Sequence, residues 1–309
     1  FMVNASINDK NIFGSGLNLG FSIDHSSKRD TLNLSLSNPA IRDSIYSGSI
    51  NVYNKDSLIE STDTTSTNGD ETTTTNGASI GVGRSIGRHT RVGITYAIED
   101  TDVTYELSSV DNSSYTTSAI TPYINYNSTD DYYVPRSGIN TGTSLKIAGL
   151  GGDADYMLSS TYFKYFHSFE KLIDKDWIFR YKTNVKMLED TGEIPDDTTF
   201  YMGGISSVRG YESYAFQPED GAAPYKKTWT NSIELGFPLI PSAKMRWALF
   251  YDYGTIGTDN FNDIKRSGYG ALLSWISPVG PLQFVFSKPI DNEAGDKTSS
   301  FEFNLGSKF

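Results

Sequence analysis

The last nine residues of the chain, 301–309, form an alternating pattern that few folds can accommodate. One face of an extended strand over these residues is apolar and the other is polar. The apolar set is Phe301, Phe303, Leu305 and Phe309, and the polar set is Glu302, Asn304 and Lys308. A soluble protein rarely exposes such a stripe beside a strand edge, because both promote aggregation. The pattern favours a transmembrane β-barrel, with the apolar set facing lipid, over the terminal strand of a soluble sandwich.

The same alternation recurs from end to end, interrupted by Gly, Asn, Asp and Ser turns. It predicts about fifteen strands, at 1–8, 16–25, 30–38, 44–55, 76–86, 90–106, 114–128, 138–149, 155–168, 176–188, 226–238, 243–255, 266–277, 281–289 and 299–309. No segment has the pattern of a helix of useful length. The sequence therefore predicts an all-β fold, an antiparallel transmembrane barrel domain over 1–309. Single-chain bacterial barrels have even strand numbers, so either one strand is misjudged or one lies outside this chain.

Composition agrees with a barrel and excludes several other classes. Hydrophobic residues make up only 37%, yet Tyr 20, Phe 17 and Gly 28 are high, as in half-polar strands with aromatic girdles. No run approaches the ~20 apolar residues of a spanning helix. The net charge of -11 argues against a nucleic-acid partner, and Cys 0 excludes disulfides and thiolate metal sites. The three histidines are isolated, so we expect no metal site, no cofactor and no catalytic residue.

The strand predicted over 176–188 requires a wet interior. One of its faces carries Arg180, Lys182 and Lys186, which a soluble core would bury at high cost and a hydrated lumen accommodates. We expect the lipid face to include Leu17, Leu19, Phe21, Val92, Ile94, Phe179, Tyr181, Phe301 and Phe303. We expect the lumenal face to include Asn18, Ser22, Arg180, Lys182, Asn184, Glu302 and Asn304.

The connections between strands are expected to alternate between short turns and long loops, which is the plan of an outer-membrane barrel. Short turns are predicted at 11–15, 87–89 and 278–281, and long loops at 56–76 and 189–225. The stretch 61–67 is rich in Thr and Ser and has no apolar anchor, so we expect a mobile surface loop there.

The long segment 189–225 contains a candidate site. The paired glycines Gly203 and Gly204 precede Val208-Arg209-Gly210-Tyr211, which suggests a tightly folded loop with one cation at its tip. If Arg209 is buried in the lumen it requires a carboxylate partner. Glu234 and Asp252, on the polar faces of two following strands, are the candidates. The residues alone leave open the alternative that all three side chains are separately solvated.

These motifs together resemble the BamA family and its wider superfamily of outer-membrane assembly and secretion barrels. The matching segments are Asn8 to Gly16 (the turn between the family's second and third strands), Val208-Arg209-Gly210-Tyr211, Phe250-x-Asp252-x-Gly254, Ser277 to Leu282, and Phe301 to Gly306 with Phe309. The resemblance spans the whole chain. One departure is Tyr211, where the family more often has Phe.

The resemblance implies that the parent protein has a barrel of 16 strands. About 15 of them would lie in the barrel domain over 1–309. The POTRA repeats and first barrel strand would precede the chain, and 189–225 would be an extracellular loop folding into the lumen. The implied function is insertion of β-barrel proteins into the Gram-negative outer membrane, without enzymatic chemistry. Clients would enter at a seam between the first and last strands, the latter carrying Phe301, Phe303, Asn304, Leu305, Gly306 and Phe309. Implied partners are outer-membrane lipids, unfolded barrel clients and accessory lipoproteins bound through the POTRA repeats.

Three other functions remain open at this stage. A related barrel could assemble autotransporters or secrete a partner protein, and its N-terminal region would distinguish it. A passive porin would lack the Val208-Arg209-Gly210-Tyr211 motif and would conduct steadily. An outer-membrane phospholipase would need a serine paired with a histidine, and no such pair is recognisable in the sequence.

Overall fold

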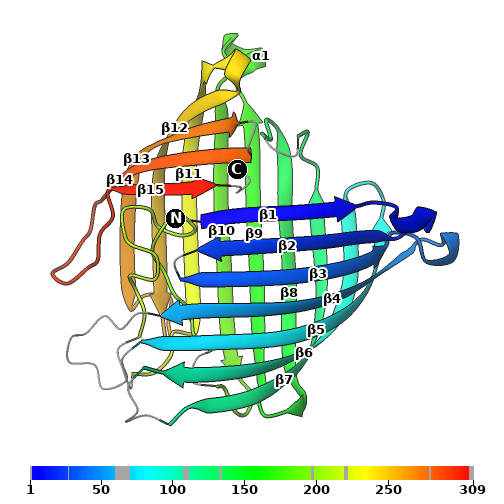
Figure 1. The fold of residues 1–309 in the computed structure, drawn as a ribbon. Coiled ribbons are helices and arrows are strands. Elements are labelled where there is room, and N and C mark those ends of the chain that lie inside the picture. Colours follow the sequence, from blue (N-terminus) through cyan, green and yellow to red (C-terminus); the bar gives the residue numbers. More distant parts are fainter. Residues whose placement is uncertain are drawn as a thin grey trace.

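The chain forms a barrel of strands around an interior that contains part of the chain itself, as a computed structural model shows (Figure 1). The structure describes residues 2–26, 28–59, 70–106, 111–131, 134–195, 198–218, 222–277 and 280–305. The strands are β1 (Met2–Asp9), β2 (Asn18–Ser26), β3 (Arg29–Asn38), β4 (Tyr46–Ile59), β5 (Glu71–Ile86), β6 (Thr90–Tyr105), β7 (Ser113–Asn127), β8 (Gly138–Gly152), β9 (Tyr156–Ser168), β10 (Ile178–Asp190), β11 (Lys227–Ile240), β12 (Met245–Gly257), β13 (Ile264–Ser277), β14 (Gly280–Pro289) and β15 (Phe301–Leu305). The predicted all-β barrel and its strand count are confirmed.

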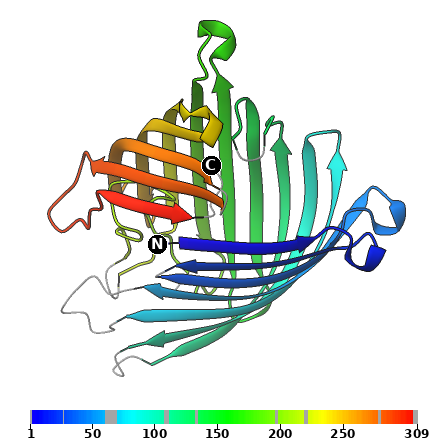
Figure 2. The ribbon, with the colours of Figure 1, turned by 45° about the horizontal axis from the view of Figure 1, so that its top comes forward.

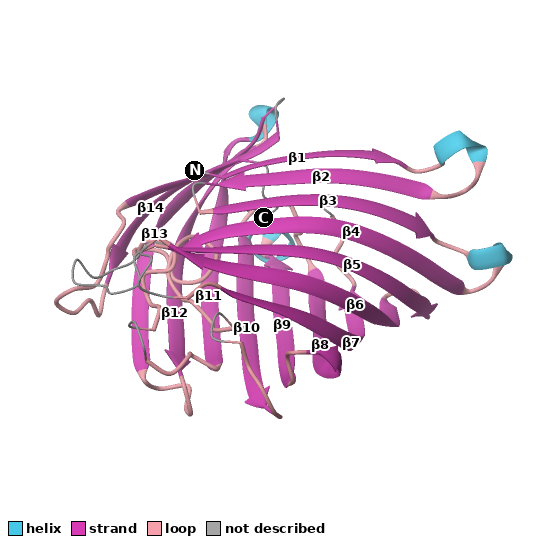
Figure 3. Cartoon of the chain, turned by 60° about the horizontal axis from the view of Figure 1, so that its bottom comes forward, coloured by secondary structure: helices cyan, strands magenta, loops and turns pink. Residues whose placement is uncertain are grey.

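Helices are few and short. They are η1 (Ile12–Gly14), η2 (Ile41–Asp43), α1 (Glu170–Ile173) and η3 (Pro241–Ala243). Each lies in a connection that follows an odd-numbered strand, so all of them lie at one end of the barrel (Figure 3). Among the described residues, no helix is long and apolar enough to cross a membrane.

Every strand pairs antiparallel with its neighbours in sequence, and the sheet closes where β1 meets β15. That closing pair is parallel and, among the residues that the structure describes, consists of one pair of partner residues, Val3 with Leu305. By contrast, β14 and β15 are in register from Leu282–Leu305 to Phe286–Phe301. Figure 2 shows the blue β1 and the red β15 approaching each other only near the N-terminus. Among the described residues, the barrel therefore has a weakly bonded seam between β1 and β15.

Side-chain exposure follows the predicted two-residue alternation. Phe21, Ile94 and Phe301 are exposed on the outer surface. Val92 and Tyr181 are half-buried but face outward, because their cross-strand partners Ile124 and Ile233 are exposed. The remaining residues predicted to face lipid are half-buried on the same face; they are Leu17, Leu19, Phe179 and Phe303.

The polar face points into the barrel as predicted. Arg180, Lys182, Asn184 and Asn304 line one interior cavity. Glu302 accepts a hydrogen bond inside the barrel from the backbone N–H of Ile205. Asn18 and Ser22 are half-buried and share a face of β2 with Gly20, which packs against interior side chains. No arginine or lysine of β10 is therefore placed on the lipid face.

Two sequence predictions about connections were wrong. The range 56–76 is not one loop, because β4 continues to Ile59, β5 begins at Glu71, and these two residues are partners. Threonine-rich segments suit a strand when a neighbour supplies hydrogen bonds. The stretch 61–67 itself lies outside the described residues. The expected alternation of short and long connections also fails, since 27–28 and 153–155 lie at the same end as the longest connection.

Candidate functional site

The connection between β10 and β11 folds back into the barrel, and we call residues 191–226 the lumen loop. Its bounds differ slightly from the predicted 189–225, because β10 runs on to Asp190 and β11 begins at Lys227. An apolar cluster anchors it to the wall: Met202, Val208, Tyr211 and Phe216 from the loop are buried with Ile256 of β12. The burial of these side chains stabilises a loop that has little regular structure.

The paired glycines permit a tight turn before the arginine. Gly203 and Gly204 have φ angles of 117° and 81°, a region that side chains disfavour. A Cβ on Gly203 would lie 2.4 Å from the carbonyl oxygen of Glu212. The Ser207 hydroxyl closes the turn by accepting from the Gly203 N–H at 2.8 Å and donating to its carbonyl at 2.9 Å. Both glycines therefore adopt the positive φ angles that the predicted tight turn requires.

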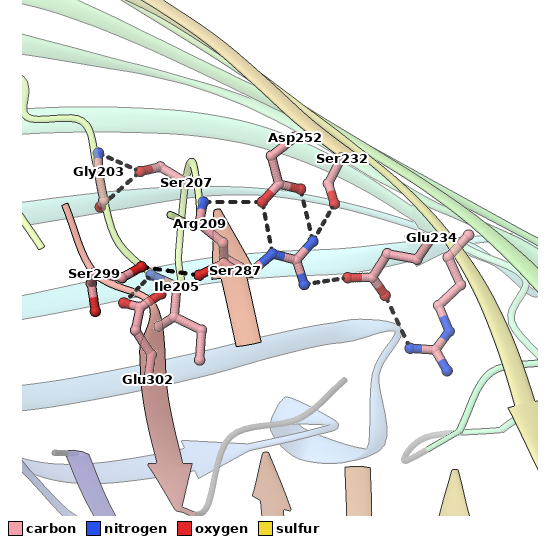
Figure 4. Close-up of polar contacts among 11 residues, drawn as sticks. Gly203, Ile205, Ser207, Arg209, Ser232, Glu234, Asp252, Ser287, Ser299 and Glu302 are labelled. Carbon is pink, nitrogen blue, oxygen red and sulfur yellow. Dashed lines mark hydrogen bonds and ion pairs between the residues drawn. The ribbon is translucent and has the colours of Figure 1, made fainter. Parts of the chain in front are cut away.

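Arg209 projects from this turn to the inner wall (Figure 4). Its Nε and Nη2 donate to Oδ2 and Oδ1 of Asp252, both at 2.7 Å, so the guanidinium and carboxylate form a two-bonded fork. Nη1 donates to Glu234 at 2.7 Å and Nη2 to the Ser232 hydroxyl at 2.8 Å. The Arg209 backbone N–H also donates to Asp252 at 3.1 Å. The structure thus brings together the loop arginine and both candidate carboxylates.

The wall residues of Phe250-x-Asp252-x-Gly254 on β12 each make a separate contact with the loop. The Arg209 Cζ lies 3.5 Å from the centre of the Phe250 ring, a close cation–π contact. The Asp252 carboxylate holds the guanidinium edge. Gly254 leaves room for the loop, since a Cβ there would lie 2.5 Å from Val208 Cγ2. The spacing works because alternate residues of a strand share one face.

The ion pair between Arg209 and its two carboxylates is buried, so each charge needs the opposite charge beside it to offset the loss of water. The side chains of Arg209, Asp252 and Glu234 are 8%, 1% and 16% exposed. Burial alone would lower the pKa of the Arg209 guanidinium, but the charges of Glu234 and Asp252 and their hydrogen bonds raise it above its ordinary value. Glu234 is also shared, because Arg180 Nη1 donates to its other oxygen at 3.2 Å. Arg209 therefore remains charged, and two cations and two carboxylates balance locally.

Beyond the arginine, the lumen loop pairs with the segment that precedes the last strand. Tyr211 and Thr298 form an antiparallel bridge, and the N–H of Glu212 and of Ser299 donate to the carbonyls of Lys297 and Gly210 at 3.0 and 3.1 Å. Burial raises the pKa of the Tyr211 hydroxyl to about 12, with the Asp296 carboxylate adding to this. The hydroxyl therefore stays protonated.

One contact joins the lumen loop to β15 directly. The backbone N–H of Ile205 donates to Glu302 Oε1 at 2.9 Å (Figure 4). The other carboxylate oxygen of Glu302 is buried without a hydrogen-bond partner among the described residues. The lumen loop is thus tied to β12 through Arg209 and to β15 through Ile205.

The structure separates the predicted residues into two groups. Val208, Arg209, Gly210, Tyr211, Glu234 and Asp252 meet at the lumen loop, whereas Phe301, Phe303, Asn304 and Leu305 lie on β15 beside the seam. Gly306 and Phe309 lie outside the described residues. Sequence reasoning missed the Ser232, Arg180 and Glu302 contacts. The available signals were the shared face of Ser232 and Glu234 and the inward faces predicted for Arg180 and Glu302. No described group of His, Asp and Glu side chains could hold a metal ion.

Comparison with known proteins places this geometry in a family. A model of the Omp85 superfamily domain matches residues 11–309. The chain belongs to the Omp85 superfamily. Among its relatives, outer membrane protein assembly factor BamA of Nitratidesulfovibrio vulgaris is 24% identical over 336 residues, covering 100% of this chain and 40% of that protein. The same factor of Neisseria meningitidis serogroup B is 29% identical over 232 residues, covering 59% and 28%. This Omp85 chain therefore spans about two fifths of the Nitratidesulfovibrio relative.

Solved structures show the same Omp85 fold. BamA from Haemophilus ducreyi lacking POTRA domains 1-3 superposes with a TM-score of 0.82 at 21% identity, covering 99% of this chain and 67% of that one. CdiB from Acinetobacter baumannii gives 0.69 at 16% identity, covering 98% and 56%. Fold and relatives together make this chain an outer-membrane β-barrel and confirm the predicted superfamily.

The role of Gly254 can be tested by adding one methyl group. In Gly254→Ala the new Cβ would lie 2.5 Å from Val208 Cγ2 and 2.6 Å from Met202 Sδ. Overpacking of this kind costs about 1–3 kcal/mol, so we expect lower stability to urea and faster proteolysis of the lumen loop.

Gly236→Ala is the matched control, because Gly236 lies on the adjacent strand β11 and the nearest atom to its Cβ would be 3.3 Å away. This variant should behave like the wild type. If both alanine variants lose equal stability, the close packing of the loop on Gly254 is not the cause.

Proposed function

We propose that this barrel inserts and folds other β-barrel proteins into the outer membrane of a Gram-negative bacterium. The relatives that carry the name of an outer-membrane protein assembly factor support this proposal. The observation that carries it is the seam, where the described parts of β1 and β15 share one pair of partners, Val3 with Leu305. The proposed activity is physical rather than enzymatic.

The seam supplies what a client strand lacks in lipid. A strand in hydrocarbon has no water to satisfy its backbone N–H and C=O groups. An opened β1–β15 seam exposes such groups on both strand edges, and an unfolded client strand can add to an edge by β-augmentation. A seam with few hydrogen bonds opens more easily than a fully paired one, and β5 with β6 is an example of two strands paired along their whole length.

The directions of the strands suggest a further element at the seam in the parent protein. β1 and β15 run parallel, while every other neighbouring pair is antiparallel. An additional strand between them would restore antiparallel pairing on both sides and give the even strand number usual in single-chain bacterial barrels. We propose that the first barrel strand and POTRA repeats of the parent precede the residues described here, and that in the parent the gate lies between that first strand and β15. In the 309-residue chain the β1–β15 seam takes the place of that gate.

The lumen loop has a supporting role in this proposal. Arg209 pins the loop to Asp252 and Glu234 on the wall, while Ile205 contacts Glu302 on the seam strand β15. A pinned loop, extracellular in origin, would hold the wall in shape while the seam opens. The proposed partners are outer-membrane lipids around the apolar belt, unfolded barrel clients at the seam, and accessory lipoproteins bound through the POTRA repeats.

Reconstitution tests the proposed function. We expect lipid vesicles that contain this protein to accelerate folding of a urea-denatured client barrel several-fold, because a templating edge removes the unpaired intermediate. Folding would be measured by the resistance of the client band to SDS and protease.

Vesicles with an equal amount of an unrelated closed barrel provide the control, since any barrel disturbs lipid packing. Equal client folding rates in the two preparations would contradict the proposal. Steady ion conductance without acceleration would instead favour a passive porin.

A further inference from the structure

Two lysines face each other inside the barrel, and neither has an ion-pair partner of its own among the described residues. Lys164 of β9 and Lys182 of β10 are directly opposite partners in the register. Opposite residues on one face have Cβ atoms about 5 Å apart, and like charges there are destabilising. Neither ammonium makes a hydrogen bond or ion pair with any residue that the structure describes, although both line the same cavity.

The carboxylates of this cavity are already engaged. Its lining includes four cations, Lys164, Arg180, Lys182 and Arg209, and two carboxylates, Glu234 and Asp252. Asp252 binds Arg209, and Glu234 is shared by Arg209 and Arg180. The two lysines therefore leave an excess of two positive charges, within a chain whose net charge is -11.

The rest of the lining is polar and suits a charged occupant. Asn184 lies two residues beyond Lys182 on the same inward face, Ser206 comes from the lumen loop, and Gln283 and Asn304 are partners on β14 and β15. Amide and hydroxyl groups can donate to oxygen, and each lysine ammonium supplies three donors. Donors thus outnumber free acceptors on this part of the wall.

We propose that Lys164 and Lys182 form a lumenal binding site for an oxyanion, a phosphate or carboxylate group with at least two acceptor oxygens. Such a group bridges two adjacent ammonium ions with charge-assisted hydrogen bonds and cancels their mutual repulsion. A cation is excluded by the positive excess, and a neutral ligand would leave the repulsion in place. The site lies in the same cavity as the Arg209 ion pair but uses the two lysines that this ion pair leaves unengaged, and it does not depend on client insertion.

Lysine acetylation measures how much of the proposed anion site is occupied, because a bound anion protects Lys164 and Lys182 from the reagent. The full chain in uncharged detergent is treated with a limiting acetylating reagent, with phosphate or chloride at equal ionic strength, and each lysine is followed by mass spectrometry. At ten times its dissociation constant a ligand leaves about one site in eleven free, so acetylation of Lys164 and Lys182 should slow about tenfold in phosphate. Lys186, inward on the same strand but outside the cavity lining, is the internal control.

Substitution locates the site. In Lys164→Gln, phosphate should no longer protect Lys182, and in Lys182→Gln it should no longer protect Lys164. Phosphate should raise the melting temperature of the wild type and of Lys186→Gln but not of the double variant Lys164→Gln/Lys182→Gln. Glutamine removes like-charge repulsion, so these variants should fold.

The outcomes discriminate clearly. Equal protection of Lys186, no protection at any phosphate concentration, or an unchanged melting shift in the double variant would overturn the proposal. A tetraglutamate peptide as a second probe separates the sources of the oxyanion. Protection at lower concentration by the peptide than by phosphate would identify carboxylates of a polypeptide in the lumen, and the reverse would identify a small free anion.

Discussion

Replacing Arg209 by alanine is expected to lower the free energy of unfolding by about 3–5 kcal/mol, as for other buried ion pairs that lose one partner. The loss is large because the Asp252 carboxylate, with a side chain 1% exposed, would be left buried without the guanidinium that now meets both of its oxygens. Urea unfolding in lipid vesicles measures the change. Proteolysis of the lumen loop should accelerate in parallel, since the same side chain holds the loop to the wall.

Two further variants show whether the loss of stability in Arg209→Ala comes from leaving a buried carboxylate unpaired or only from removing a contact. Arg209→Ala/Asp252→Ala removes both charges and should be more stable than Arg209→Ala alone. Arg136→Ala is the matched control, because Arg136 also contacts two carboxylates, Glu170 and Asp176, but its side chain is 36% exposed. Exposed pairs are worth up to about 1 kcal/mol. A loss in Arg209→Ala no larger than in Arg136→Ala would show that Arg209 does not pin the loop.

The barrel could be predicted from sequence because its strands repeat one simple rule. In β3 the outward Leu32, Leu34 and Leu36 alternate with inward Asn33 and Ser35. A single residue of register slip would place all of these on the wrong face. The alternating pattern, the apolar lipid outside and the hydrated interior therefore all require the same orientation of the side chains.

Connections were less predictable because their ends depend on the neighbouring strand. Residues 56–59 and 71–75 looked like loop from composition, yet they pair across β4 and β5. These residues are held in a strand by hydrogen bonds to the partner strand, and their own sequence pattern does not indicate a strand.

The candidate site was partly predictable. Burial of one loop arginine demands carboxylates, and the polar faces of β11 and β12 offered Glu234 and Asp252. The contact of Glu302 with Ile205 could not be foreseen, because it uses a backbone N–H whose direction depends on the folded turn at Gly203 and Gly204. Backbone donors leave no trace in residue identity.

Locking the seam is expected to abolish client insertion while leaving the barrel folded. Val3→Cys and Leu305→Cys place two thiols on the one partner pair of β1 and β15. Neighbouring strands lie about 4.8 Å apart, within the range of Cα separations that a disulfide bridges. The chain has Cys 0, so any disulfide formed is the engineered one. Oxidised and reduced protein are then compared in the vesicle assay, and reduction should restore insertion.

The control is a disulfide at a strand pair that does not have to open. Phe284→Cys and Phe303→Cys lock β14 to β15 at partner residues facing the same outer surface. Client folding should continue with this bond complete, because the templating edges of β1 and β15 stay free. The two locked barrels differ only in which side of β15 is fixed. Undiminished insertion with the Val3–Leu305 bond complete would rule out a β1–β15 gate, since backbone groups held in a closed seam cannot pair with a client strand.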